Sequence, residues 1–310
     1  MGDNQEVWLI FGKNGWIGGK MIEMMEAKGK TFHLADARTQ NRQDVIAEIE
    51  KYKPTHILNA AGVTGRPNVD WCEDHKQETI RTNVIGCLTM ADLCDQYNIH
   101  HTLYATGCIF EYDDEHTIGG KGFTEEDKPN FHASYYSHTK ALVEELLKEY
   151  KNTMTLRVRM PISDDLAARN FLTKIIKYER VVNVPNSMTT LTDMLPVSLA
   201  MAEKKLTGIY NFCNPGAISH NECLDLYTKY VDPSYTYKNF SLEEQAQILK
   251  AGRSNNTLDH TKLCASVPEI EIPEIHLAVE NVFKRMRVNL ENEVDAEGNK
   301  VWPNNLPKRV

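Results

Sequence analysis

Short apolar runs alternate with amphipathic stretches along the first half of the chain. The apolar runs have the length of β-strands and lie at residues 7–11, 31–35, 56–61, 101–106 and 155–159. Between them, apolar residues recur at spacings of three and four, which predicts helices at residues 16–28, 45–52, 80–94 and 135–150. Strands that alternate with helices are typical of a parallel sheet covered by helices.

The second half of the chain follows a less regular pattern. Helices are predicted at residues 170–178, 196–204, 221–231, 241–249 and 275–286, and short strands at 181–184 and 208–212. Polar residues dominate from Asn289 onward. Together with Pro303 and Pro307 they indicate a loosely held tail.

The two halves together predict a Rossmann-type, doubly wound α/β fold with a smaller C-terminal substrate-binding region. Residues 1–160 are the expected dinucleotide-binding domain, to which residues 186–214 return. Residues 161–185 and 215–288 are the expected substrate-binding region, and residues 289–310 are the polar tail.

Composition and charge narrow the class of protein. The chain has 310 residues, of which 41% are hydrophobic, enough for one large domain or a core domain with a smaller one. No run approaches the roughly 18 consecutive apolar residues of a membrane span, and the polar N-terminus lacks the basic region of a secretory signal. The net charge of −8 argues against nucleic acid, because phosphate backbones bind basic surfaces. We therefore expect neither a membrane nor a nucleic-acid partner.

The seven cysteines and eleven histidines are scattered without the spacing of metal ligands. An odd, dispersed set of cysteines in a chain without a secretory signal is typical of reduced thiols in the cytosol. We therefore expect a cytoplasmic protein with no structural metal.

A glycine-rich run, Gly12-Lys13-Asn14-Gly15-Trp16-Ile17-Gly18, follows the first predicted strand and opens the first predicted helix. Glycines let the backbone turn tightly and approach a pyrophosphate, which the N–H groups at the start of the helix can bind. A glycine-rich turn alone is weak evidence for a dinucleotide site, but its position between a strand and a helix is what such a site requires. Cofactor contacts are expected from Gly12, Asn14, Gly15, Trp16, Ile17 and Gly18.

Two further segments belong to the expected cofactor site. Asp36 and Arg38 follow the second predicted strand, where an acid favours NAD through a ribose hydroxyl and an arginine favours NADP through its extra phosphate. We expect NADPH through Arg38, with NADH as the alternative. The third predicted strand ends in the small residues expected where backbone passes close to a cofactor, although a tight strand end would look the same: Asn59, Ala60, Ala61 and Gly62.

Tyr136 and Lys140 form a Tyr-x-x-x-Lys pair on a predicted helix. Residues four apart lie on one helix face, and an ammonium beside a phenol stabilises the phenolate and lowers the pKa of the tyrosine. The tyrosine is then a usable proton donor or acceptor near neutral pH. A hydroxyl partner is expected at the end of the preceding strand, where Thr106 lies.

The ordered set of these motifs, with Thr82-Asn83 between them, resembles the extended short-chain dehydrogenase/reductase superfamily. Four longer blocks are similar, more narrowly, to the bifunctional nucleotide-4-keto-6-deoxyglucose 3,5-epimerase/4-reductases of nucleotide-rhamnose synthesis. These blocks are residues 59–73, 104–112, 156–163 and 253–256, and the similarity runs from residue 7 to about residue 285.

The resemblance implies roles for individual residues. Thr106, Tyr136 and Lys140 correspond to the reductase triad, with Tyr136 protonating the C4 oxygen, and Asn83 belongs to the cofactor set. Cys108 and Lys174 match the positions of a catalytic cysteine and its acid/base partner, which invert C3 and C5. A thiol beside a cationic lysine can ionise near neutrality, although a cysteine in that place is more often a small buried residue.

Four residues are candidates for holding the substrate. Arginine suits a diphosphate, and asparagine suits a base edge or a sugar hydroxyl, although each could be a structural hydrogen-bonding residue instead. The candidates are Arg253, Arg159, Asn170 and Asn186.

The sequence leaves two other functions as alternatives to the bifunctional enzyme. One is a 4-reductase that acts after a separate epimerase, and the other is a non-catalytic NADP-binding regulatory subunit. The substrate nucleotide, UDP or dTDP, is not distinguished. We expect a partner enzyme, a 4,6-dehydratase, to supply the ketosugar, and by analogy with the superfamily we expect a homodimer.

Overall fold

The computed structural model describes residues 6–66 and 68–308 and contains a six-stranded sheet in which every neighbouring pair is parallel. The strand order is β2-β1-β3-β4-β5-β7. The strands are β1 (Trp8–Phe11), β2 (Phe32–Leu34), β3 (His56–Asn59), β4 (His100–Thr106), β5 (Thr153–Val158) and β7 (Gly208–Tyr210).

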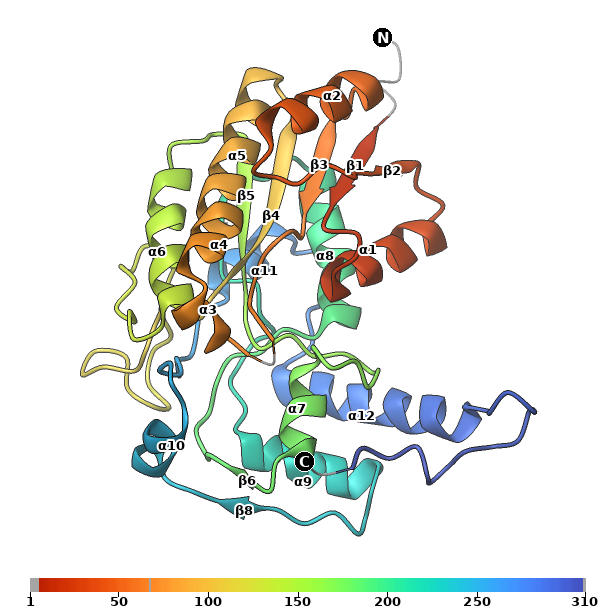
Figure 1. Cartoon of the computed structure of the whole chain (residues 1–310). Coiled ribbons are helices and arrows are strands. Elements are labelled where there is room, and N and C mark those ends of the chain that lie inside the picture. The colour runs from red at the N-terminus through yellow and green to blue at the C-terminus, as the bar shows by residue number, and fades with distance from the viewer. Residues whose placement is uncertain (1–5, 67, 309–310) are drawn as a thin grey trace.

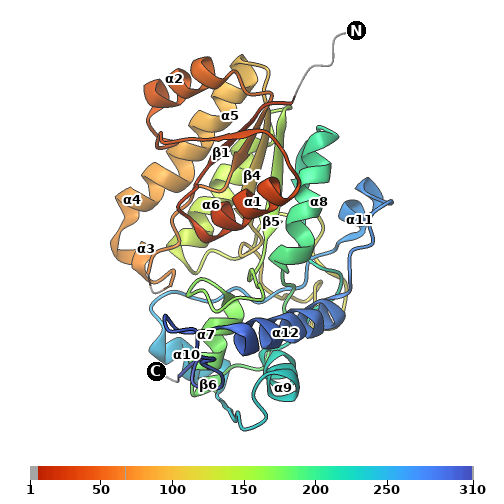
Figure 2. The same ribbon diagram turned by 90° about the vertical axis from the view of Figure 1, so that its right-hand side faces the viewer.

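Helices cover both faces of this sheet (Figures 1 and 2). One face is covered by α1 (Trp16–Ala27) and α8 (Leu191–Glu203). The other is covered by α2 (Arg42–Tyr52), α5 (Gly86–Gln96) and α6 (Tyr135–Leu147). Because both faces are covered, every residue of β1, β3 and β5 is buried, including polar residues of β3 and β5 such as His56, Asn59 and Arg157. The doubly wound fold predicted from the sequence is confirmed.

The helix predicted over residues 80–94 is longer and less regular in the structure. Short helices α3 (Trp71–Asp74) and α4 (Lys76–Ile80) lead into a π-helical turn, η1 (Arg81–Ile85), and then into α5. A π-helical turn inside an α-helix is rare and often marks a functional site.

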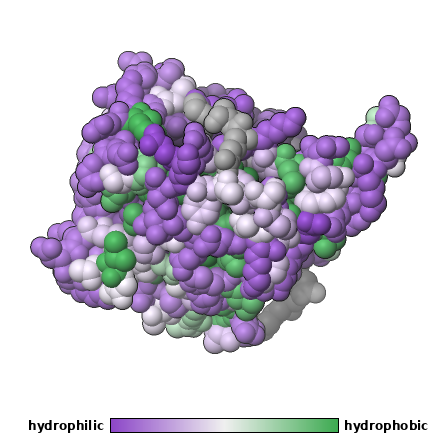
Figure 3. All heavy atoms as spheres, turned by 90° about the horizontal axis from the view of Figure 1, so that it is seen from below, coloured by the Kyte–Doolittle hydropathy of each residue, from purple (hydrophilic) through white to green (hydrophobic). Residues whose placement is uncertain are grey.

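A second, smaller region lies beyond the carboxyl ends of the strands, at the lower end of Figure 1. It contains α7 (Phe171–Lys177), α9 (His220–Tyr230), α10 (Leu242–Ile248) and α12 (Ile275–Asn292), with the two-stranded sheet of β6 (Arg180–Val181) and β8 (Lys238–Asn239). The short helix α11 (Thr261–Ser266) packs beside the main sheet through Leu263. Seen from that end, the surface is mainly hydrophilic with scattered apolar residues (Figure 3).

The structure corrects several predicted boundaries in the second half. Helix α8 begins at Leu191 instead of Pro196, because Thr190 at its start is fixed by a 2.7 Å hydrogen bond to Asp193 and the proline is accommodated inside the helix. Helix α12 continues to Asn292, and Trp302 and Leu306 pack on the C-terminal core. The segment after Asn289 is therefore held more firmly than its polar composition predicts. Residues 309–310 of that segment lie outside the described residues, as does Pro67 in the block 59–73.

The strand order fixes where a ligand can enter. The chain passes from β1 to β2 on one side and then to β3 on the other, so a crevice opens at the carboxyl ends of β1 and β3. The glycine run follows β1 and the small residues Ala60, Ala61 and Gly62 follow β3, and both therefore meet at this crevice. Among the described residues, no helix is both long and apolar enough to cross a membrane.

Candidate active site

The glycine turn after β1 is tightly packed against the end of β3. Gly12 has φ +88, and a Cβ added there would lie 2.6 Å from the carbonyl carbon of Ala60. A Cβ on Gly18 would lie 2.2 Å from the Gly12 oxygen. Gly15 is exposed and caps the start of α1, so its end of the turn faces solvent. This shape, which leaves no room for a side chain and presents helix N–H groups, fits a dinucleotide pyrophosphate.

The first turns of α1 are tied to the substrate-binding region. Trp16 donates from Nε1 to Asp165 Oδ2 at 3.1 Å, and Lys20 forms an ion pair with the same carboxylate at 2.9 Å. The sequence predicts Trp16 as a cofactor contact, and the structure gives its indole nitrogen this protein partner. Asn14 is exposed and Ile17 is partly buried against the core beneath the sheet.

The acid and the arginine after β2 are both exposed, but they are not equivalent. Lys13 in the glycine turn pairs with Asp36, and this hydrogen bond and charge hold the pKa of Asp36 below its usual range. Arg38 is exposed. Lys13 is not among the cofactor contacts predicted from the sequence, although its position inside the glycine run could have indicated a role there.

Asn59 and Asn83 shape the loop that follows β3. Asn59 accepts a hydrogen bond from Ala61 N at 3.1 Å, and the Asn83 amide bonds both the N–H and the carbonyl of Val63, at 2.8 and 2.7 Å. Asn83 lies in the π-helical turn η1, which brings its amide to this loop. Both residues, predicted as cofactor contacts, therefore build the wall of the crevice through contacts within the protein.

Thr106 and Tyr136 meet at the end of β4. Thr106 is the last residue of β4, and its hydroxyl forms a hydrogen bond with Tyr136 near the start of α6. The Thr106 Oγ1 also accepts from Cys108 N at 3.1 Å, which places the cysteine beside the pair. Ser134 begins α6 by accepting from Ser137 N at 3.1 Å, and so fixes the first turn that carries Tyr136.

The predicted effect of Lys140 on the tyrosine is not the dominant one. Burial raises the pKa of Tyr136, and nearby Cys108 acts in the same direction, while the hydrogen bond from Thr106 opposes them. Lys140 lies four residues along α6 and is 6% exposed. In this structure, Tyr136 is therefore held as a neutral phenol, which is the form that donates a proton.

A cavity of about 770 Å³ joins the two regions of the molecule. Its lining includes Cys108 and Tyr136 from the Rossmann domain together with Lys174 and Arg253 from the substrate-binding region. The rest of its wall is largely apolar, with Phe171, Ile175, Val181, Val182 and Phe240. The structure thus brings four of the predicted site residues to one cavity.

Lys174 and Arg253 face the cavity from different elements. Burial lowers the pKa of Lys174, and the charges of Arg169 and Arg253 lower it further. Arg253 is held by Asp70, whose Oδ1 lies 2.9 Å from Nη1. Arg169 is held by Thr64 at 3.0 Å and by the Gly65 carbonyl at 2.6 Å.

The other three predicted substrate contacts lie behind the cavity wall. Asn170 caps α7 by accepting from Leu172 N at 3.1 Å, and its amide donates to the carbonyls of Ser163 and Asp165, both at 2.7 Å. Asn186 accepts from the guanidinium of Arg159. Arg159, Asn170 and Asn186 are all 0% exposed, so this geometry favours structural roles over direct substrate contact.

Several cavity residues are absent from the sequence-based set. One is Arg169, which directly precedes Asn170. Two others, the cation Arg180 and the aromatic Phe240, come from the short segments around β6 and β8. The sequence did contain a signal for Arg169, since it directly precedes the predicted helix 170–178 that carries Lys174. No sequence signal indicated Phe240, because residues 232–240 show no hydrophobic periodicity.

The fold and the site define a nucleotide-cofactor oxidoreductase architecture with an added substrate-binding region. Residues 7–288 match the family described as the RmlD substrate binding domain, and the chain belongs to this family. It is 61% identical over 265 residues to a bifunctional dTDP-4-dehydrorhamnose 3,5-epimerase/dTDP-4-dehydrorhamnose reductase from Arabidopsis thaliana, covering 85% of this chain and 88% of the relative. The resemblance read from the sequence motifs is therefore confirmed.

Two further comparisons place the chain among larger and solved relatives. It is 55% identical over 265 residues to a trifunctional UDP-glucose 4,6-dehydratase/UDP-4-keto-6-deoxy-D-glucose 3,5-epimerase/UDP-4-keto-L-rhamnose-reductase from Arabidopsis thaliana. That match covers 85% of this chain but 40% of the relative. The crystal structure of a UDP-rhamnose synthase from Acanthamoeba polyphaga mimivirus superposes with a TM-score of 0.87 at 40% identity, covering 91% of this chain and 100% of the other.

Proposed function

We propose that the protein converts a nucleotide-4-keto-6-deoxyglucose to nucleotide-L-rhamnose by 3,5-epimerisation and NADPH-dependent reduction of the 4-keto group. The observation that carries this proposal is the single cavity lined by Cys108, Tyr136 and Lys174. One thiol, one phenol and one amine around the same space provide the proton transfers that both reactions need. The two activities in the name of the 61% identical relative support the same pair of reactions.

Inversion at C3 and C5 needs a base on one face of the sugar and an acid on the other. The hydrogens at these carbons are acidic because the C4 carbonyl, directly or through its enol, delocalises the electron pair that is left. We assign the base to the Cys108 sulfur and the acid to the Lys174 ammonium. The lowered pKa of Lys174 makes its ammonium a stronger acid than that of an ordinary lysine, which suits this role. Both groups exchange with water, so solvent deuterium is expected at C3 and C5.

Reduction at C4 uses the other end of the site. Tyr136 is a buried neutral phenol that forms a hydrogen bond with Thr106, and we assign to it the proton that the C4 oxygen receives. Lys140 lies on the same helix and supplies positive charge beside the phenol as that proton leaves. Arg253 and Arg169 fit the substrate diphosphate, because both are cations at the cavity.

The glycine turn with Gly12, Gly15 and Gly18 is the proposed holder of the cofactor pyrophosphate. A bound reduced nicotinamide dinucleotide supplies the hydride that C4 receives. We favour NADPH, because Lys13 already occupies Asp36, the carboxylate that would otherwise favour NADH, while Arg38 is exposed beside it. NADH remains the second candidate.

The test is product analysis by NMR in D₂O, with NADPH and either UDP- or dTDP-4-keto-6-deoxyglucose. We expect nucleotide-L-rhamnose with deuterium at C3 and C5. Cys108→Ala should remove the deuterium incorporation while reduction of an already epimerised ketosugar continues. Exchange that persists in this variant would show that another group is the base, and reduction without exchange in the wild type would identify a 4-reductase only. No turnover of either substrate would favour an NADP-binding regulatory subunit.

We further propose a cytoplasmic enzyme that receives its ketosugar from a 4,6-dehydratase. All seven cysteines are free thiols, which suits a reducing compartment. The fused dehydratase named in the trifunctional relative supports a partner of that activity. The homodimer stays a prediction, to be checked by light scattering of the purified chain.

A further inference from the structure

Arg159 is a completely buried arginine that has no carboxylate partner within the described parts of the chain, 6–66 and 68–308. Its Nη1 donates to Cys108 Sγ and to Ser254 Oγ, each at 3.2 Å. Its Nη2 donates to Asn186 Oδ1 and, at 2.8 Å, to the Ser254 carbonyl. The buried Nε has no hydrogen-bond acceptor. All the oxygen acceptors are neutral, so this guanidinium keeps a positive charge that nothing balances.

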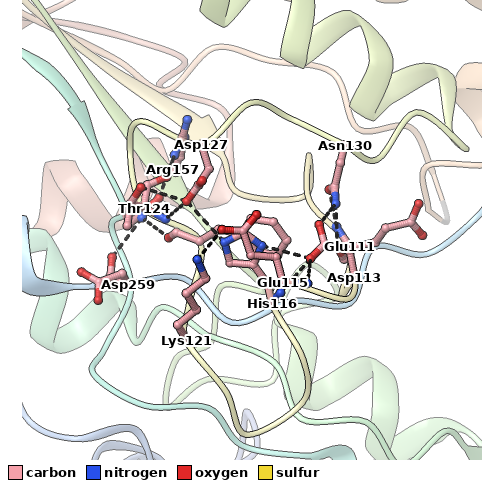
Figure 4. A network of polar contacts seen from close by, with 12 residues as sticks. Glu111, Asp113, Glu115, His116, Lys121, Thr124, Asp127, Asn130, Arg157 and Asp259 are labelled. Carbon is pink, nitrogen blue, oxygen red and sulfur yellow. Dashed lines mark hydrogen bonds and ion pairs between the residues drawn. The ribbon is translucent and has the colours of Figure 1, made fainter.

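Arg157, near the end of β5 and two residues before Arg159, is a buried arginine that does have a carboxylate partner. Arg157 is 1% exposed and forms a two-point ion pair with Glu144, with Nε–Oε2 at 3.0 Å and Nη2–Oε1 at 2.7 Å. Its Nη1 also donates to the Thr124 carbonyl at 3.2 Å, inside the polar network of the loop before α6 (Figure 4). Fully buried arginines are rarely left without an anionic partner. At Arg159, two residues farther along, the group that can become an anion is the Cys108 thiol.

We propose that Arg159 is the counter-cation of a Cys108 thiolate, and so the positioning residue that keeps this sulfur ready to accept a substrate proton. The second part of the proposal rests on the epimerase function proposed above. Loss of the thiol proton would place a negative charge 3.2 Å from a buried guanidinium and would balance its charge. A neighbouring cation in a partly buried site favours the thiolate over the thiol.

The backbone holds the guanidinium in this place. Arg159 N donates to Thr189 Oγ1 at 3.0 Å, and Thr189 N donates back to the Arg159 carbonyl at 2.8 Å. Gly107, next to the cysteine, packs closely against Leu258, since a Cβ there would lie 2.7 Å from Leu258 Cδ1, while its distance to Arg159 Cδ would be an ordinary contact of 3.5 Å. Met160, which lines the cavity, takes the strained φ of +37 that turns the chain away after Arg159.

The other charged groups around the sulfur differ in how they respond to pH. Burial raises the pKa of the nearby phenols, which therefore stay protonated, namely Tyr112, Tyr136 and Tyr178. Burial, with a smaller effect from Arg159, lowers the pKa of His220 to about 4, so it is neutral above that pH. Other charged side chains line the cavity, namely Arg169, Arg180, Arg253 and Glu179. Lys174 is a further cation at the cavity, and burial together with the charges of Arg169 and Arg253 lowers its pKa.

The test measures the ionisation of Cys108 directly and uses no nucleotide sugar. The full chain is treated with iodoacetamide between pH 5.5 and 10, and alkylation of each cysteine peptide is followed by mass spectrometry. Cys264 is the internal control, because it is also partly exposed and burial raises its pKa. The variants are Arg159→Met, which removes the charge, Arg159→Lys, which keeps it, and Lys174→Met, which removes the other titrating cation.

In the wild type, Cys108 should reach half its maximal rate at a pH at least about one unit below that of Cys264. Arg159→Met should raise the half-maximal pH of Cys108 by about 1–3 units, a 10- to 1000-fold loss of thiolate at neutral pH. Arg159→Lys should restore most of it, and Lys174→Met should move it less than Arg159→Met does. A purely structural role would change the maximal rate, which reports access, and leave the midpoint in place.

The proposal is overturned if Cys108 and Cys264 titrate together in the wild type, a result that does not depend on any variant folding. It is also overturned if Arg159→Met, folded as judged by circular dichroism, leaves the Cys108 midpoint unchanged. Failure of the proposed function is a different result. In that case the midpoints shift as expected, but the wild type incorporates no solvent deuterium into either 4-keto-6-deoxy nucleotide sugar.

Discussion

The glycine turn offers the sharpest test of the fold, through the substitution Gly12→Ala. This change puts a methyl group where three backbone atoms already lie, at 2.6 Å (Ala60 C), 2.7 Å (Ala61 N) and 2.8 Å (Ala60 O). It also forces an alanine into a backbone conformation with φ +88. Neither neighbour is the movable end of a side chain, so β1 and β3 have to separate or the turn has to change.

The magnitude follows from the two costs. Positive φ costs a residue with a Cβ roughly 1–2 kcal/mol. Overpacking against backbone costs roughly 1–3 kcal/mol more. The free energy of unfolding should therefore fall by about 2–5 kcal/mol, the sum of these two costs. Gly19→Ala is the matched control, because Gly19 lies in α1, directly after the turn, with nothing within 4 Å of the added Cβ. That change should stabilise the helix by about 0.5–1 kcal/mol.

The assay is urea unfolding of both variants followed by circular dichroism, with a fluorescence titration of NADPH on each. Gly12→Ala should lose both stability and NADPH binding, while Gly19→Ala should lose neither. If Gly12→Ala unfolds within about 1 kcal/mol of the wild type, below the least cost expected, the close approach of the turn to β3 is wrong. If it is destabilised but binds NADPH normally, the turn is structural and the cofactor lies elsewhere.

Three further outcomes are expected. Asn170→Ala removes the cap of α7 and the two hydrogen bonds that the amide donates, so stability should fall by about 1–3 kcal/mol; Asn170→Asp keeps the cap but sets a buried carboxylate oxygen against the same two carbonyls, so it should lose at least as much in the same urea titration. Arg157→Met leaves Glu144 buried without its partner and should cost about 3–5 kcal/mol. The double variant with Glu144→Leu should recover most of that loss, and no recovery would contradict the pairing. Burial lowers the pKa of His56 and His220 to about 4, below the unfolded value of 6.5. Unfolded chains therefore bind more protons as pH falls from 6.5 towards 4, and each histidine should cost up to about 1.4 kcal/mol per pH unit there and nothing above pH 7.5. His56→Gln should flatten that slope in melting temperatures.

The elements that depend on local pattern were predictable. Strand β1 is apolar throughout because both its faces are covered, and its sequence shows this, while β3 and β5 carry apolar residues together with buried polar ones. The start of α8 was not predictable from local pattern, because a proline such as Pro196 is typical of the first residue of a helix. The helix begins earlier, where Thr190 forms a hydrogen bond with Asp193. The firm packing of Trp302 also depends on a distant partner, Arg287, whose guanidinium lies 4.0 Å from the ring centre.

For the site, the sequence predicted residues that line one cavity, but it did not predict which arginine and asparagine side chains lie behind the cavity wall. Cys108 and Lys174 stand at positions that the family resemblance marks, and the structure brings both to one cavity. The sequence could not distinguish an arginine on the cavity surface from one behind it. Arg159 and Arg253 look alike in the chain, yet Arg159 is 0% exposed and Arg253 lies at the cavity surface. That difference depends on how residues 186–189 and 254–256 close around the strand end.

The carboxylate of Asp165 limits how this fold can be recombined. This carboxylate accepts a hydrogen bond from Trp16 and pairs with Lys20, both in the first helix. The backbone carbonyl of Asp165 accepts a hydrogen bond from Asn170, the cap of the helix that carries Lys174. A chimera that joins the first 160 residues to the second region of a distant relative would break this chain of contacts unless the new segment keeps an acid in that place. The two halves are therefore expected to have diverged together rather than as exchangeable modules.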